Sequence, residues 1–256
     1  MSFFQRIRAI TLLIVAPFLT ITVSFMAWFD MCCVRRSKKK ALAFPRFWGV
    51  FLCRLAGVTV EFKGLDHIQP DRTYIFAGNH CSQFDIFCFQ GFFPYNFRWI
   101  AKKELFRIPV FGAAMKKVGY IAIDRSRGRK ALKSLEEAAR QIAQGDSVLI
   151  FPEGTRSQTG RLQEFKTGAI ILAIKAGVPV IPLGINGSDT ILPKGRLLAD
   201  SGKIVVNIGK PVPTDHYTAK DKQKLARALH LEVEKLLEPR QRSEVTASFT
   251  GENKPG

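Results

Sequence analysis

Short apolar runs alternate with longer helical patterns through most of this chain of 256 residues, beginning at Val58. The runs are four to six residues long, which is the usual length of a buried strand. Strands that alternate with helices predict an α/β fold in which a mostly parallel sheet is flanked by helices. The expected strands are Val58–Phe62, Tyr74–Ala77, Arg98–Ala101, Tyr120–Ile123, Val148–Phe151, Val180–Ile185 and Ile204–Ile208.

Three of the segments between or after these strands carry helix signals. Residues Gly128–Gln144 and Leu162–Ala176 repeat apolar residues at helical spacing, and a glycine follows each of them. The third predicted helix, Thr218–Leu237, opens with a Thr-x-x-Asp capping box and ends before a proline. We therefore expect an α/β domain over residues 58–238 and a polar, disordered tail over residues 239–256.

Two motifs fall at the carboxyl ends of two expected strands, where sites gather in parallel sheets. The first is Asn79-His80-Cys81-Ser82-Gln83-Phe84-Asp85, and the second is Phe151-Pro152-Glu153-Gly154-Thr155-Arg156-Ser157. The first supplies a base with a candidate orienting group, and the second supplies a turn suited to binding an anion. Together they indicate proton abstraction from a hydroxyl group beside a phosphate.

His80 carries the side chain best suited to remove a hydroxyl proton near neutral pH, and Asp85 is the candidate that would orient it. Residues five apart on a regular helix point about 140° apart. The pair can therefore meet only if His80 lies in a turn and Asp85 lies in the first turn of the following helix. Ser82-x-x-Asp85 resembles a capping box that would begin this helix. In the alternative interpretations Asp85 merely caps the helix, or Cys81 acts as a nucleophile.

The second motif combines groups that bind phosphate. Gly154 lets the backbone approach a ligand and present its amides, Arg156 offers a planar fork of donors, and Thr155 offers a hydroxyl group. Glu153 could hold Arg156 or bind a substrate hydroxyl. The alternative is a plain turn at a strand end, with a solvated arginine.

The segment 97–112 mixes cations, Lys102 and Lys103 among them, with apolar and aromatic residues. It is either an edge strand followed by a core helix, or a phosphate-steering patch beside a groove for an acyl chain. Farther along, Arg125, Arg127 and Arg129 form a basic cluster that we expect to face a carrier or a lipid surface.

The N-terminal residues 1–57 are predicted to anchor the chain in a membrane. Residues Ala9–Phe29 carry no charge over 21 positions, long enough to span a bilayer and too long for a signal peptide. A basic cluster at residues 35–40 favours the cytoplasmic leaflet. Residues Phe44–Val60 include two arginines, which suits a helix lying in the interface. The anchor is therefore either one span or a two-helix hairpin in one leaflet.

The net charge and the cysteines indicate which kinds of partner and which kinds of site the chain can have. The formal net charge of +18 implies an anionic partner: nucleic acid, a phospholipid surface, or an acidic substrate or carrier. The aromatic residues cluster in apolar runs instead of interleaving with basic residues, which argues against nucleic acid. Five cysteines without a CxxC spacing indicate neither a disulfide framework nor a zinc site.

Four blocks in order make the chain similar to the glycerolipid acyltransferase family, and in particular to its 1-acyl-sn-glycerol-3-phosphate acyltransferase branch. They are His80-x4-Asp85, Lys102-Lys103-Glu104-Leu105 with Ile108-Pro109-Val110-Phe111-Gly112, Phe151 to Ser157, and Val178-Pro179-Val180-Ile181-Pro182. One departure is Cys81, where the branch often has glutamine, and it bears on the identity of the acceptor.

The resemblance implies a role for each candidate residue. His80, oriented by Asp85, would deprotonate the sn-2 hydroxyl of lysophosphatidic acid, which attacks an acyl thioester without a covalent enzyme intermediate. The acceptor phosphate would be held by the remaining candidates, namely Glu153, Gly154, Thr155, Arg156, Lys102 and Lys103.

The resemblance also implies partners. The donor would be acyl-CoA or acyl-carrier-protein, the product phosphatidic acid, and no metal or other cofactor would be needed. The basic cluster and the short chain without organelle signals favour the cytoplasmic face of a bacterial inner membrane, where membrane phospholipids would surround the enzyme. Alternative acceptors are glycerol 3-phosphate, another lysophospholipid or a lyso-aminolipid. A more distant alternative is a basic membrane-anchored binding protein without turnover.

Overall fold

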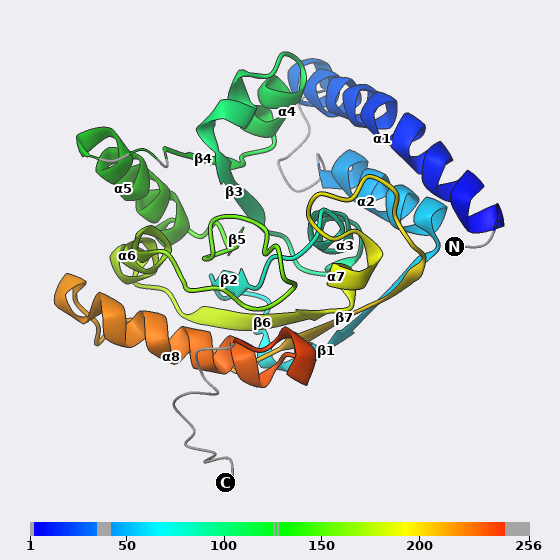
Figure 1. Cartoon of the computed structure of the whole chain (residues 1–256). Helices are drawn as coiled ribbons and strands as arrows, with labels where there is room; N and C mark the ends of the chain where they lie inside the picture. Colours follow the sequence, from blue (N-terminus) through cyan, green and yellow to red (C-terminus); the bar gives the residue numbers. More distant parts are fainter. Residues whose placement is uncertain (1–2, 35–41, 125, 127, 244–256) are drawn as a thin grey trace, which may run out of the picture.

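One seven-stranded sheet organises the chain, with strand order β1-β7-β6-β2-β5-β3-β4 (Figure 1). The computed structural model describes residues 3–34, 42–124, 126 and 128–243. All seven predicted strands are confirmed, with ends within two residues of the prediction. They are β1 Val58–Lys63, β2 Ile75–Gly78, β3 Arg98–Lys102, β4 Ile121–Ile123, β5 Val148–Ile150, β6 Val180–Asn186 and β7 Gly202–Ile208.

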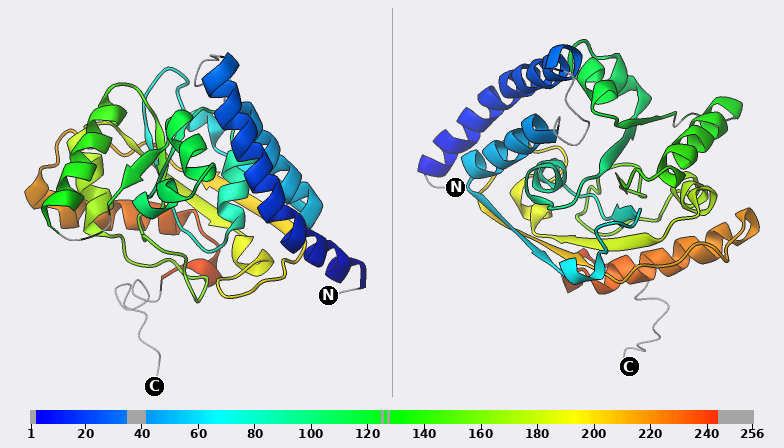
Figure 2. Two further views of the ribbon diagram at one scale, coloured as in Figure 1. Left: turned by 90° about the horizontal axis from the view of Figure 1, so that it is seen from above. Right: turned by 180° about the vertical axis from the view of Figure 1, so that it is seen from behind.

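The sheet is parallel except where β6 and β7 run antiparallel. Alternate residues of the central strands face opposite layers of helices, as the two-residue period of a strand requires. Thus Phe76 of β2 packs with the cluster that includes α2 and α3, whereas Ile75 and Ala77 pack with α5, α6 and α8. The α/β prediction is therefore confirmed, with helices on both faces (Figure 2).

The helices connect the strands in chain order and vary from short turns to one of 27 residues. They are α1 Phe3–Phe29, α2 Ala43–Ala56, α3 Phe84–Phe92, α4 Phe111–Lys117, α5 Arg129–Ala143, α6 Thr167–Ala176, α7 Ser188–Ile191 and α8 Lys222–Lys235. Shorter 3-10 turns include η4 Lys103–Arg107, η5 Ala219–Asp221 and η6 Pro239–Gln241.

Two predicted boundaries are wrong for reasons visible in the hydrogen bonds. Helix α6 begins at Thr167 instead of Leu162, because the backbone N–H groups of Leu162 and Gln163 bond to Gln241 and Glu153 outside any helix. The tail was expected to be disordered from Pro239, but residues 239–243 fold back as η6 and bury Gln241. The predicted capping box of Thr218 and Asp221 is confirmed.

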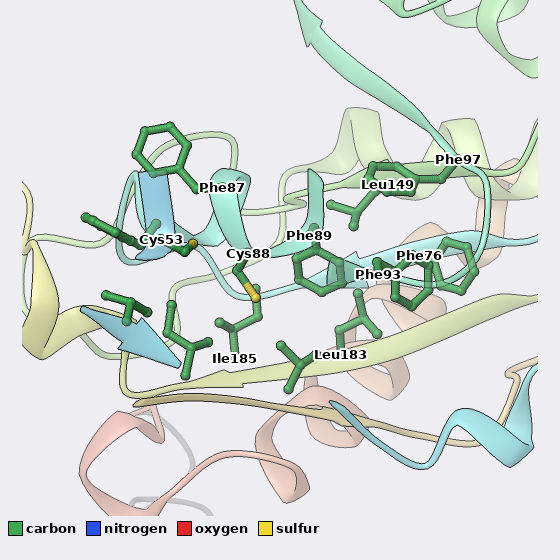
Figure 3. Close-up of a cluster of buried hydrophobic side chains, with 14 of the residues drawn as sticks. Cys53, Phe76, Phe87, Cys88, Phe89, Phe93, Phe97, Leu149, Leu183 and Ile185 are labelled. Carbon is green, nitrogen blue, oxygen red and sulfur yellow. The ribbon is translucent and has the colours of Figure 1, made fainter. Parts of the chain in front are cut away.

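The two N-terminal helices are part of the folded body. Helix α1 packs along α2 and α4, and α2 packs on α3 (Figure 1). Leu52 and Cys53 of α2 are fully buried in a cluster with Phe76, Phe89 and other aromatic side chains (Figure 3). Over the described residues, one helix, Phe3–Cys33, is long and apolar enough to cross a membrane. The basic cluster 35–40, like Arg125 and Arg127, lies outside those residues.

Helices α2 and α3 cross at two facing glycines, which allows their backbones to touch. A Cβ atom added to Gly91 would lie 2.6 Å from the backbone nitrogen of Val50, and one on Gly49 would lie 2.5 Å from that of Gly91. Neither contact can be relieved by moving a flexible side chain. The position of the N-terminal helices on the domain therefore depends on these two residues.

We expect Gly91→Ala to lower the free energy of unfolding by about 1–3 kcal/mol, since the added methyl forces two helix backbones apart. The measurement is the thermal unfolding midpoint in detergent. Gly168→Ala in α6 is the control, because its Cβ would meet nothing closer than 3.9 Å. Equal midpoints for Gly91→Ala and the wild type would contradict the close crossing.

Candidate active site

A cavity of about 720 Å³ lies between the sheet and the N-terminal helices. One part of it is polar, where His80, Lys102 and Arg156 line it. The rest is formed mostly by apolar side chains from α1 to α4 and β3, including Val23, Phe111 and others. The cavity thus joins a charged end to an apolar body, which suits an amphipathic ligand.

His80 and Asp85 meet as the sequence predicts. His80 lies in the turn after β2 and Asp85 is the second residue of α3, which brings Nδ1 to 2.8 Å from Oδ2. Asp85 is fully buried, and the same oxygen accepts the backbone N–H groups of Cys81 (2.8 Å) and Ser82 (2.9 Å). The carboxylate therefore orients the imidazole and also accepts hydrogen bonds at the start of helix α3. Asp85 thus both orients His80 and caps the helix, so the two interpretations are compatible.

The capping box predicted at Ser82 forms only in part. Its backbone N–H donates to Asp85, but its hydroxyl accepts from the backbone N–H of Phe84 (3.2 Å) and donates to the carbonyl of Leu192 (2.9 Å). Ser82 therefore also connects this turn to the loop after α7.

The imidazole of His80 is held flat by Phe151. The two rings stack with centroids 3.9 Å apart and planes 6° from parallel. Because Nδ1–H donates to Asp85, Nε2 is the nitrogen left with a lone pair. Within the described part of the chain Nε2 has no hydrogen-bond partner, and the side chain keeps 13% of its surface exposed at the cavity. This arrangement can accept a proton from a ligand.

The backbone of His80 is clamped by the second motif. Its N–H donates to Glu153 Oε1 at 2.7 Å, and its carbonyl accepts from the N–H of Ser157 at 2.7 Å. On the other side, the amide of Asn79 bonds both the N–H (2.7 Å) and the carbonyl (2.9 Å) of Ile185 in β6. Three strands thereby fix the position of the base.

Glu153 does not hold Arg156 or face a ligand, and that prediction is wrong. It is buried, and both oxygens are occupied: Oε1 by His80, and Oε2 by the backbone N–H (3.2 Å) and side-chain amide (2.8 Å) of Gln163. Burial raises the pKa of Glu153 to about 8, although these donors lower it. Glu153 is therefore a positioning residue for His80.

Arg156 lines the cavity, and its guanidinium makes no ion pair with any residue that the structure describes. The backbone amide of Gly154 was expected to bind phosphate, but its N–H donates to the carbonyl of Phe151 at 3.0 Å, inside the motif. Gly154 has a φ of +77°, which closes this turn. Thr155 is exposed beside Arg156, as expected.

The structure separates the two candidate lysines. Lys102, at the end of β3, lines the cavity and lies 3.8 Å from the exposed Glu104. Lys103 points away and forms an ion pair with Asp124 at 2.5 Å, which lowers the pKa of that carboxyl. Lys103 is not among the residues that line the cavity, so the structure favours Lys102 over Lys103 as the cation that contacts a ligand there.

Lys194 is a cation near the site that the sequence patterns did not single out. It lies on the loop after α7, and its Nζ donates to the carbonyl of Arg156 (3.2 Å) and the hydroxyl of Thr155 (3.4 Å). Pro193 pairs with Ser82 through an isolated bridge, so this loop contacts both motifs. Lys194 stands outside the four blocks, and no local pattern marks it.

Two further observations limit the chemistry. Cys81 is buried, and burial raises the pKa of its thiol, which argues against a nucleophile. Gln90, another residue that lines the cavity, accepts hydrogen bonds from Trp99 and Tyr120, both at 2.7 Å. No group of three or more potential metal ligands occurs within the described ranges.

Known proteins resemble this chain in sequence and in structure. The family model described as Acyltransferase matches residues 59–186. The chain is 32% identical over 197 residues to 1-acyl-sn-glycerol-3-phosphate acyltransferase alpha of Homo sapiens, covering 77% of this chain and 70% of that protein. It is 34% identical over 165 residues to 1-acyl-sn-glycerol-3-phosphate acyltransferase of Limnanthes alba, covering 64% and 58%.

A solved structure is similar over nearly the whole chain. The crystal structure of the 1-acyl-sn-glycerophosphate (LPA) acyltransferase PlsC from Thermotoga maritima matches with a TM-score of 0.74 at 25% identity. The match covers 98% of this chain and 100% of the other, so the fold is the same from the N-terminal helices onward.

The raised pKa of Glu153 predicts how stability depends on pH. Because the folded-state pKa lies above the value in the unfolded chain, Glu153 stabilises the fold fully below about pH 4.5 and loses this contribution as the pH rises through about 8. The unfolding midpoint of the wild type should therefore fall more steeply between about pH 5 and about pH 9 than that of Glu153→Gln, which cannot titrate.

The control for a change of charge is Glu137→Gln on the exposed face of α5. It should keep the steep dependence of the wild type. Parallel curves for wild type and Glu153→Gln would contradict the assignment.

Proposed function

Because the chain belongs to the acyltransferase family, we propose that it transfers a fatty acyl group from an acyl thioester to the sn-2 hydroxyl of 1-acyl-sn-glycerol 3-phosphate, giving phosphatidic acid. The observation that carries this proposal is the lone pair of His80 Nε2, held at the same cavity that Arg156 lines, where the guanidinium makes no ion pair with any described residue. A base next to an anion site fits an acceptor that carries its hydroxyl close to a phosphate.

The proposed reaction uses the geometry of the His80–Asp85 pair. Nε2 accepts the proton of the sn-2 hydroxyl as its oxygen attacks the thioester carbonyl, and Asp85 stabilises the imidazolium that forms. When the tetrahedral intermediate collapses, the new ester C–O bond remains, the C–S bond breaks, and the thiol leaves with the proton from His80. No covalent enzyme intermediate and no cofactor is required, and the donor is acyl-CoA or acyl-carrier-protein.

The acceptor phosphate would be bound by Arg156 and Lys102, the two cations that line the polar part of the cavity. Lys194 supports this site by holding the carbonyl of Arg156 and the hydroxyl of Thr155. The apolar part, between α1 and α4, would receive an acyl chain. Holding both substrates in one cavity supplies much of the acceleration, because their encounter becomes intramolecular.

The packing of α1 favours a hairpin in one leaflet over a single span. One side of the helix, including Leu12 and Val23, is buried, and Trp48 of α2 donates to Thr20 at 2.9 Å. The other side exposes a stripe of large apolar residues that a leaflet would cover. The stripe consists of Phe3, Phe4, Ile7, Ile10, Leu13, Ile14, Phe18, Ile21, Phe25, Met26 and Phe29.

We propose that the chain lies on the cytoplasmic face of a bacterial inner membrane.

The proposed reaction predicts that His80→Ala loses acceptor-dependent release of thiol by about 10²- to 10⁴-fold, which is the usual contribution of a general base. The measurement is thiol release from an acyl thioester by purified protein in detergent with lysophosphatidic acid. Cys81→Ala is the control, and it should retain activity since the buried thiol is not used.

Other outcomes would change the assignment. Release with glycerol 3-phosphate, or with a lyso-aminolipid, would move the acceptor and keep the base. No release with any acceptor or donor from folded wild-type protein would overturn the enzyme and leave a basic membrane-binding protein.

The contacts of Lys194 predict a selective effect on the acceptor. Lys194→Ala should raise KM for lysophosphatidic acid about tenfold, because a charged hydrogen bond to the Arg156 segment is lost, while KM for the thioester is unchanged. Lys194→Arg should recover part of the loss. Arg196→Ala, on the same loop but paired with Asp200 at 2.8 Å, is the control. An equal rise of both KM values would contradict a role in phosphate binding.

A further inference from the structure

One short loop combines backbone strain with exposed apolar side chains. Val110 has φ +62° and ψ −60°, and the N–H of Phe111 donates to the carbonyl of Pro109 at 2.6 Å. This is a classic γ-turn, which is rare and strained. Over the described ranges Val110 is the one non-glycine residue with positive φ, and a β-branched side chain is among the least suited to it.

The apolar side chains in and before the strained turn are largely exposed and bury little surface in the core of the protein. Val110 is 37% exposed and Ile108 46%, and Leu105 at the preceding η4 turn is 39% exposed. The turn is nevertheless fixed, because a Cβ on the next glycine, Gly112, would lie 2.3 Å from the carbonyl oxygen of the buried Phe106. The strain is thus maintained by the packing of the neighbouring residues, and strain of this kind marks the turn as a candidate functional segment.

The charge and position of this turn favour a lipid surface as its partner. Segment 102–117 contains five basic residues and one acidic residue, and Arg107, Lys116 and Lys117 around the turn are exposed. Helix α4, which begins directly after the turn, packs against α1 (Figures 1 and 2). Leu105 and Phe111 also line the cavity, which places the turn at its rim.

We propose that the segment Leu105–Val110, here called the rim loop, is a second membrane contact that inserts its apolar side chains into an anionic phospholipid leaflet. This proposal rests on the proposed function only in taking the exposed side of α1 as the membrane face. Aliphatic side chains enter the leaflet, and the flanking cations meet lipid phosphates at its surface. The rim loop thereby holds the mouth of the cavity against the leaflet, so that a lysophospholipid can move from the bilayer into the site.

Insertion can be measured without turnover, which separates this proposal from the proposed reaction. Ile108→Trp is bound to vesicles of phosphatidylcholine and phosphatidylglycerol, with bromine on the acyl chains in one of two matched sets. We expect the emission added by the new tryptophan, relative to wild type, to be quenched by the brominated lipid. Leu231→Trp, an exposed leucine of α8, is the control and should not be quenched. Equal emission of Ile108→Trp with both lipid sets would overturn the proposal.

A second variant tests whether the strain serves the membrane. Val110→Gly relieves the positive φ and removes the apolar side chain, so we expect a higher unfolding midpoint together with weaker binding to the same vesicles. Higher stability with unchanged vesicle binding would show that the strained turn does not contribute to membrane binding and would overturn the proposal.

A third variant separates lipid from an acidic protein partner. Ile108→Asp should lower turnover of lysophosphatidic acid in vesicles about tenfold, because a charge must enter the leaflet, and should leave turnover in detergent unchanged. Leu231→Asp is the matched control. Equal losses in vesicles and detergent, seen with a carrier-linked donor and absent with acyl-CoA, would assign the rim loop to the acyl carrier and overturn the proposal.

Discussion

The site depends on how the backbone of one histidine is held. Both polar groups of the His80 peptide bond to the second motif, the N–H to Glu153 and the carbonyl to the N–H of Ser157. These two bonds join His80 to residues 73 and 77 positions further along the chain, and they fix the position of His80 relative to the segment that carries Arg156. A carboxylate buried for this purpose is costly, and three N–H donors offset part of the cost. The imidazole itself is then oriented by its hydrogen bond to Asp85 and by stacking on Phe151.

The parts of the structure that follow local rules could be predicted from the sequence. The strands could be predicted because short apolar runs between helical patterns usually form buried strands. The contact between His80 and Asp85 could be predicted because only one arrangement of turn and helix allows it. The direction of Glu153 could not be predicted, since its partner Gln163 belongs to a segment that resembles the start of a helix. Nor could the sequence choose Lys102 over Lys103, because the choice depends on Asp124 from a neighbouring strand.

Long-range contacts explain the remaining differences. Lys194 approaches Arg156 only because the loop after α7 pairs with Ser82, a contact between residues far apart in the chain. Residues 239–243 look like a polar tail, yet Gln241 bonds the backbone of Leu162 and Ile185. Such bonds satisfy backbone groups of segments far away in the chain, and a polar sequence gives no sign of them.

The N-terminal helices show why an apolar run does not by itself specify a membrane span. A helix surrounded by lipid needs no polar partner, whereas α1 accepts a hydrogen bond from Trp48 and lines the cavity with residues from Ala16 to Ala27. Helix α1 is apolar on both sides: one side packs against the protein, and the other side is exposed and could contact lipid. In the proposed one-leaflet arrangement, a cavity built partly from such a helix lies at the level of the leaflet. The proposed amphipathic substrate could then keep its chain in an apolar environment while its phosphate binds to Arg156, as we propose above.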